Sequence, residues 1–133
     1  DNVSLLARTS VNNGVGYEST AADYTYQYVR GATSATAAAA DTTTETGFRL
    51  SVSSAVGNAA EEGVQFDVLI DQFNASTYAW TTATVFEVIN DGSMATGVIS
   101  GRRVNATARD ALQVIFSSGN IASGIVTLEG IRG

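Results

Sequence analysis

The sequence predicts an all-β domain: an antiparallel β-sandwich of about eight strands, jelly-roll-like in arrangement. Apolar and polar residues alternate with a period of two along much of the chain. Clusters of Asn, Asp, Gly and Ser separate the alternating stretches. The 133 residues fit a single domain, 1–133. Because the sequence begins at Asp1 without Met, we expect a processed product or an excerpt of a longer protein.

Three stretches alternate most clearly, and each predicts a strand with one core face. In the longest of them, Val64 to Asp71, the inward residues are Val64, Phe66, Val68 and Ile70, and the outward residues are Gln65, Asp67, Leu69 and Asp71. In the other two, the inward residues are Phe48, Leu50 and Val52, opposite Arg49, Ser51 and Ser53, and Leu112, Val114 and Phe116, opposite Gln113 and Ile115. We expect the inward residues to share one core.

Five further segments are rich in β-branched or aromatic residues and are bounded by turn formers. These predicted strands are Val3 to Thr9, Tyr24 to Arg30, Tyr78 to Ile89, Met94 to Val104, and Ile125 to Ile131. The Ala-rich segment Ala35 to Ala40 is flanked by Ser and Thr, so we interpret it as a surface loop with at most one helical turn.

Composition excludes most enzyme classes. The chain has no Cys, no His and no Lys, so thiol catalysis, the usual nucleophile and base pairs, Schiff bases and most transition-metal sites are excluded. We therefore expect no catalytic residues, no metal and no cofactor. The net charge of -6 disfavours nucleic acid, and no apolar run is long enough for membrane insertion.

The aromatic residues are the first candidates for a ligand site. Tyr24, Tyr26 and Tyr28 alternate, so all three project from one side of a strand, either into a core or subunit interface or outward as a stacking surface for sugar rings. Trp80 is the single tryptophan and presents the same alternatives.

Charged residues give two more candidates. Arg102 and Arg103 are adjacent and are able to clamp an anionic sugar or phosphate, although arginines beside a turn are more often solvated or paired with an acid. Asp67 and Asp71 lie on a predicted solvent face, where carboxylates are usually solubilising; as a catalytic pair they would indicate a glycan hydrolase.

Several blocks of sequence resemble a known family. The run from Phe116 to Ile131, FSSGNIASGIVTLEGI, is similar to the closing hairpin of the C-terminal β-sandwich domain of tailed-bacteriophage tail-fibre and related virion structural proteins. Further similar blocks are Asp1-Asn2-Val3 leading to Ala7-Arg8-Thr9-Ser10, Ala21-Ala22-Asp23-Tyr24, and Val56 to Gly63. The resemblance implies a β-sandwich and leaves its ligand open, because such modules serve several roles.

Together, residues and resemblance lead to an expected function: a non-enzymatic module on the virion surface, of tail-fibre or head-fibre type, that attaches the particle to host-surface polysaccharide or supports the part that does. The alternatives are a purely structural decoration or fibre-assembly domain and a carboxylate-based glycan hydrolase. The expected ligand-binding residues are Tyr24, Tyr26, Tyr28, Trp80, Arg102 and Arg103.

The expected partners are other virion proteins and further copies of the chain, as a homotrimer. Fibre modules of this kind are commonly threefold, and repeated weak sites gain avidity. Aliphatic residues on supposed outer faces also require cover; they are Leu69, Val85, Ile89, Ile115, Ile125 and Ile131.

Overall fold

The computed structural model describes residues 3–20, 22–33, 35–57 and 59–130, with only the backbone described for 35–44. The described residues form eight strands and no helix. The strands are β1 (Leu5–Ser10), β2 (Tyr24–Ala32), β3 (Ala35–Glu45), β4 (Phe48–Arg49), β5 (Gly63–Asp71), β6 (Trp80–Val88), β7 (Met94–Arg103) and β8 (Ala111–Phe116).

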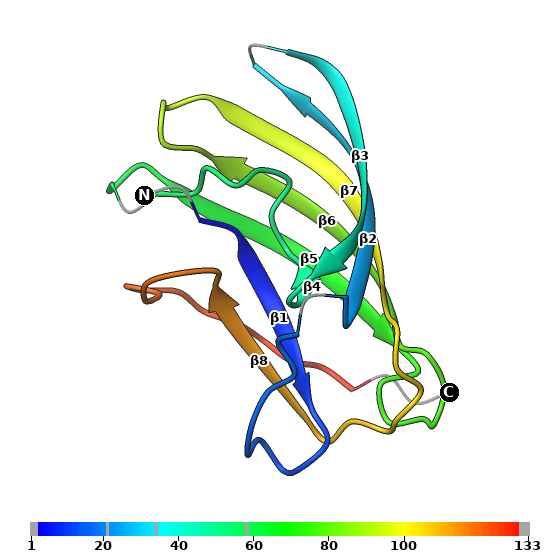
Figure 1. Ribbon diagram of the computed structural model, residues 1–133. Coiled ribbons are helices and arrows are strands. Elements are labelled where there is room, and N and C mark those ends of the chain that lie inside the picture. Colours follow the sequence, from blue (N-terminus) through cyan, green and yellow to red (C-terminus); the bar gives the residue numbers. More distant parts are fainter. Residues whose placement is uncertain (1–2, 21, 34, 58, 131–133) are drawn as a thin grey trace.

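Two antiparallel sheets build the sandwich (Figure 1). One has the strand order β4-β1-β8 and the other β3-β2-β7-β6-β5. The first strand pairs with the last and the second with the last but one, which is the jelly-roll-like feature. The strands β5, β6 and β7 follow one another as a meander, with Gly92 at φ 79° in the turn between β6 and β7.

The core lies between the sheets and contains the residues that alternation predicts to face inward, except Ile70, which is half-buried and outside both buried clusters. Phe48, Leu50 and Val52 are fully buried. Val64, Phe66 and Val68 of β5 and Leu112, Val114 and Phe116 of β8 pack against the buried clusters but stay half-buried. Because β5 and β8 are edge strands, the sandwich is less completely covered on the side where these two edges lie.

The Ala-rich segment is not a loop. It forms the first part of β3, which pairs with β2 from Ala35 to Glu45. The intrinsic helix preference of alanine is small and a helix this short is marginal in water, so backbone pairing with β2 outweighs it.

The segment around Arg49 also differs from the prediction. Strand β4 contains only two residues, and Arg49, Ser51 and Ser53, which alternation places outward, are all buried. The chain leaves the strand at Leu50 and curls around the guanidinium of Arg49, which donates hydrogen bonds to the carbonyls of Ser51 (3.0 Å) and Ser53 (2.8 Å). Satisfied hydrogen bonds make this burial of a charge tolerable.

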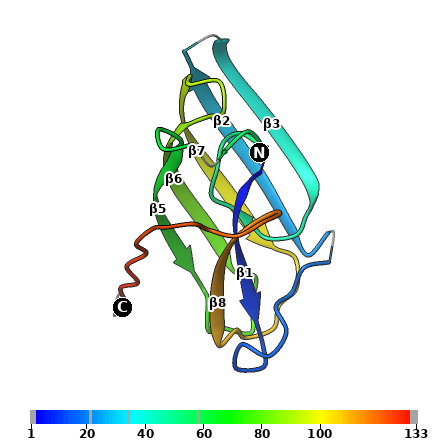
Figure 2. The ribbon, with the colours of Figure 1, turned by 90° about the vertical axis from the view of Figure 1, so that its left-hand side faces the viewer.

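The predicted C-terminal strand is absent from residues 125–130, which pair with no other strand; Ile131 lies outside the described residues. After β8 the chain continues as an extended segment that diverges from β8 in Figure 2. Ile125 is 94 % exposed and Leu128 80 %. Alternation supplies residues that suit a strand, but a strand also needs a partner edge.

Candidate functional site

Tyr24 belongs to the core rather than to a ligand site. Its side chain is fully buried, and its ring meets that of Phe48 edge to face at 5.0 Å. Its hydroxyl accepts a hydrogen bond from the backbone N–H of Thr9 (3.0 Å) and lies 3.3 Å from the carbonyl of Glu18, to which it donates. Burial raises the pKa of the Tyr24 hydroxyl above its usual value, although its hydrogen bonds to Thr9 oppose this.

Tyr26 and Tyr28 share this inner face of β2. Both are half-buried, and their rings stack at 5.9 Å. The guanidinium carbon of Arg49 lies 5.3 Å from the centre of the Tyr26 ring, and Arg49 Nη1 donates to the Tyr26 hydroxyl at 3.3 Å. The predicted shared orientation of the three tyrosines is therefore confirmed, and the structure directs all three toward the sandwich interior, the first of the two alternatives.

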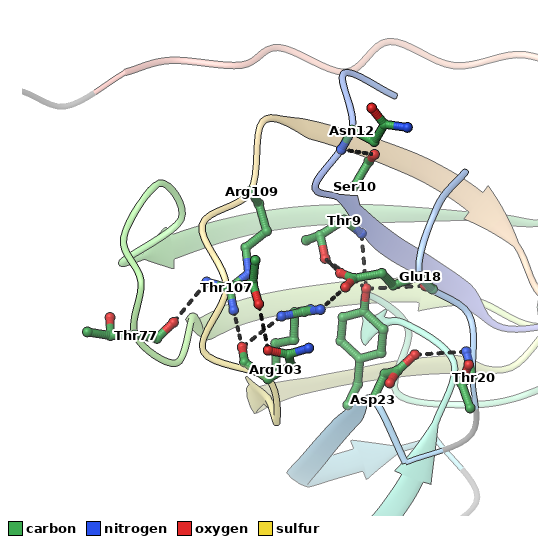
Figure 3. A network of polar contacts seen from close by, with 12 residues as sticks. Thr9, Ser10, Asn12, Glu18, Thr20, Asp23, Thr77, Arg103, Thr107 and Arg109 are labelled. Carbon is green, nitrogen blue, oxygen red and sulfur yellow. Dashed lines mark hydrogen bonds and ion pairs between the residues drawn. The ribbon is translucent and has the colours of Figure 1, made fainter. Parts of the chain in front are cut away.

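Arg103 is also part of the interior. It is 1 % exposed and pairs with the carboxylate of Glu18, which also accepts a hydrogen bond from the Thr9 hydroxyl at 2.8 Å (Figure 3). Arg103 Nη1 donates to the carbonyl of Asn105 at 2.7 Å. Burial, together with the nearby charge of Arg109, lowers the pKa of Arg103 to about 10. Arg103 therefore has a structural role in this network.

Arg109 organises the adjoining loops (Figure 3). Its Nη1 donates to the carbonyl of Thr77 at 2.9 Å, and its Nη2 donates to that of Asn105. Burial lowers the pKa of the Arg109 guanidinium. Arg109 thus ties the loop before β6 to the chain that follows β7.

Adjacent residues of a strand point to opposite faces, so Arg102 and Arg103 cannot serve one site. While Arg103 points into the interior, Arg102 is on the outer face of the five-stranded sheet. There it lies between Thr25 of β2 and Trp80 of β6, its register partners on either side. Trp80 is 49 % exposed.

The next outward position along the same three strands is polar. Gln27, Ser100 and Thr82 are register partners across β2, β7 and β6, and all three are exposed. Together the two rows create an open hollow of about 410 Å³. Its lining residues are Thr25, Tyr26, Gln27, Trp80, Ser100, Gly101 and Arg102.

Aromatic rings hold Arg102 in this hollow. Its guanidinium carbon lies 5.2 Å from the centre of the Tyr78 ring and 5.7 Å from that of Trp80, both within cation–π range. Tyr78 is 43 % exposed, so both rings present surface to solvent. The site thus combines apolar ring faces, a positive charge, an amide and hydroxyl groups.

These groups suit a shallow ligand with both apolar and hydroxyl faces. Aromatic rings stack against the C–H face of a sugar, and Gln, Ser, Thr and Arg side chains hydrogen-bond to its hydroxyls. Glycoside hydrolysis requires a pair of carboxylates. The residues that line the hollow include no such pair. Asp67 and Asp71 are exposed on the outer face of β5, with Asp71 the register partner of Trp80.

Within the described residues, no group of three or more His, Cys, Asp or Glu side chains is placed to hold a metal ion. That part of the chain also contains no helix long and apolar enough to span a membrane.

Of the six expected ligand-binding residues, the structure brings Trp80 and Arg102 together on the outer face, and Tyr26 borders the same hollow. Sequence reasoning missed Tyr78, Gln27 and Ser100 as neighbours of this pair. Once Tyr26 faces inward, the period of two indicates that Thr25 and Gln27 face outward. The pairing of strands far apart in sequence, which places Ser100 beside Gln27, has no such local signal.

Fold and site together define a class: an all-β sandwich that presents a shallow surface of aromatic rings, arginine and neutral polar groups. No family model matches the chain, and comparisons with curated proteins and with solved structures likewise gave no significant match.

Proposed function

We propose that this chain is a non-catalytic carbohydrate-binding module of a virion, which attaches the particle to host-surface glycan through the outer face of β2, β7 and β6. The main supporting observation is that Trp80, half-exposed, lies beside Arg102 with Gln27 and Ser100 on the adjoining row. The virion assignment is supported by the resemblance of the sequence blocks to tail-fibre modules.

The exposure of Trp80 favours binding over a purely structural role for this region. A tryptophan buries a large apolar area when it is covered, so leaving it half-exposed forgoes stabilisation of the fold. Exposed aromatic residues beside convergent polar groups are typical of ligand sites.

A binding assay with matched aromatic variants tests the proposal. Native protein is applied to a glycan array and to host cells alongside Trp80→Ala and Phe86→Ala. Phe86 is also on β6, faces outward and is 43 % exposed, but it lies six residues, or about 20 Å, along the strand. We expect Trp80→Ala to weaken glycan binding at least about tenfold, the loss of one good stacking contact, and Phe86→Ala to leave it unchanged.

Absence of any bound glycan, or equal binding by native protein and a folded Trp80→Ala variant, would contradict the proposal. Release of reducing ends from the bound polysaccharide would instead support the hydrolase alternative. Thermal melting of both variants checks that they are folded.

We also propose that the module acts as several copies, with a homotrimer as the expected form. Support comes from the remainder of the same outer face, where Val29 and Val98 are register partners and both are at least half-exposed. Leu69 is 56 % exposed on the same face. Exposed apolar residues that lie side by side, as Val29 and Val98 do, are typical of interaction surfaces.

A further inference from the structure

We propose that the hollow selects glycans that carry a carboxylate group, such as uronic or sialic acids, and that Arg102 binds this carboxylate. The inference rests on the proposed function and names its ligand class. Within the part of the chain that the structure describes, Arg102 is the one arginine without a hydrogen-bond acceptor.

Among the described residues, Arg102 differs from the other arginines. Each of the others donates at least one hydrogen bond to a protein oxygen; their acceptors include the carbonyls of Thr46 for Arg8, Val52 for Arg30, Ser53 for Arg49, Asn105 for Arg103 and Thr77 for Arg109. The described ion pairs are Arg49 with Glu45 and Arg103 with Glu18. The guanidinium of Arg102 lies over two aromatic rings, and Arg102 has no acidic partner in the described part of the chain.

Cation–π contacts position a guanidinium without using its N–H groups as hydrogen-bond donors. The five donors of Arg102 therefore remain for solvent or for a ligand. A guanidinium matches a carboxylate in a planar, two-point arrangement, and such charge-assisted hydrogen bonds are the strong ones. Because the rings of Tyr78 and Trp80 already restrict Arg102, less side-chain entropy is lost when a ligand binds.

The surroundings of Arg102 fit the rest of an acidic sugar. Trp80 presents an exposed ring for the apolar face, while Gln27 and Ser100 offer neutral donors and acceptors for hydroxyl groups. A phosphate or a small carboxylic acid would use Arg102 alone. An acidic sugar ring would use the arginine, the tryptophan and the polar row together.

The charge of the whole chain limits which acidic glycans suit the site. With a net charge of -6, the protein repels a dense polyanion at long range. Asp71 pairs in register with Trp80, two strands or about 10 Å from the backbone of Arg102. We therefore expect preference for glycans with separated acidic residues over densely sulfated polymers.

The test compares each acidic oligosaccharide with its neutral counterpart. Uronic-acid and sialic-acid oligosaccharides are titrated beside their carboxyl-reduced forms, in which the ring remains and the charge is removed. Because Trp80 is the single tryptophan and lies in the hollow, its intrinsic fluorescence reports binding at this place. We expect at least one acidic form to bind about tenfold or more tightly than its reduced form, as for a hydrogen bond to a charged group.

Variants assign the preference to Arg102. Arg102→Gln should bind the acidic and reduced forms equally, and Arg102→Lys should keep part of the preference because it retains the charge without the planar fork. Arg8→Gln, a matched loss of charge on β1 in the other sheet, should keep the full preference.

Two results would overturn the inference: no acidic form preferred over its reduced form by the native protein, or a preference that survives in Arg102→Gln. If glycan binding nevertheless depends on Trp80 in the array experiment, the proposed function stands and only the ligand class is wrong. If no glycan binds at all, both proposals fail.

Discussion

At the scale of single residues, the contrast between Arg102 and Arg103 shows how neighbours in sequence acquire different roles. One contacts solvent-exposed rings, and the other is buried against Glu18. Tyr24 has a similarly structural role, since its hydroxyl links β2 to Thr9 of β1. Removing that hydroxyl leaves the buried Thr9 N–H without its partner, which destabilises the fold.

Tyr24 gives a prediction for the dependence of stability on pH. Burial raises its pKa in the folded state above the usual value of 10.0, so the folded state holds the proton more tightly than the unfolded state. The stabilisation of the folded state that the protonated Tyr24 hydroxyl provides is fully present below pH 10 and is lost as the pH rises through the raised pKa. Tyr24→Phe should cost about 1 kcal/mol at pH 8. The difference in free energy of unfolding between native protein and Tyr24→Phe should shrink above pH 10.

Urea unfolding of both proteins between pH 8 and pH 11 measures this difference. The pKa of Arg103 is lowered to about 10 in the folded state. The contribution of Arg103 to the free energy of unfolding therefore changes in the opposite direction and rises as the pH increases above that value. Arg103 is present in both proteins, so its contribution cancels in the comparison. A difference that stays constant up to pH 11 would contradict the assignment of Tyr24.

At the scale of elements, β7 is the strand that joins β2 to β6 and aligns the rows of the outer face. Its inner face carries glycine at two positions where the sandwich has no room. A Cβ at Gly97 would lie 2.4 Å from the backbone carbonyl oxygen of Val29, and at Gly101 it would lie 2.6 Å from the Thr81 hydroxyl. Glycine is required at position 97 because the backbone of β2 approaches β7 closely there, and not because of a special backbone conformation.

Gly97→Ala should therefore destabilise the protein by about 1 to 3 kcal/mol, because the backbone of β2 must shift. Gly63→Ala in β5 is the matched control, since nothing lies within 4 Å of its added Cβ and its φ is not positive. That change should be neutral or stabilising by up to about 1 kcal/mol, through reduced freedom of the unfolded chain. Equal melting temperatures for the two variants would show that the register between β2 and β7 is wrong.

At the scale of the whole molecule, the side of the sandwich bordered by β5 and β8 is the least completely covered. The inward residues of both strands are only half-buried, although those of β6 and β1 are buried. Apolar surface is exposed as well along the extended C-terminal segment, at Ile125 and Leu128. An isolated chain would leave this apolar surface in water, which favours association.

We expect the chain to associate at micromolar concentrations, and the paired change Ile125→Asn with Leu128→Asn to weaken association. Val15→Asn serves as the control, because Val15 is 70 % exposed in a loop between β1 and β2 and is remote in sequence from that segment. Sedimentation velocity over a range of concentrations measures the masses. A monomer throughout would contradict the self-association proposal. An assembly insensitive to the paired change would exclude the C-terminal segment and leave the outer-face residues Val29 and Val98 as the candidate interface.

The sequence by itself indicated every observed strand except β3, because alternation and turn residues act locally, but it also predicted a C-terminal strand that is absent from residues 125–130. It correctly placed the inward faces of β5 and β8 and the turn between β6 and β7. The absence of Cys, His and Lys also excludes the chemistry that needs those three side chains. Within the candidate site, it identified Trp80 and Arg102 by residue type alone.

Only the tertiary structure decided which segments become neighbours. It made a strand of the Ala-rich segment by pairing it with β2, buried Arg49 within a curl of its own chain, and left Ile125 without a partner strand. It also placed Arg102 between Thr25 and Trp80, residues far apart along the chain. The physical reason is that a strand has two faces and two edges: alternation distinguishes the faces, but contacts between distant segments decide which face is covered and which edge is paired.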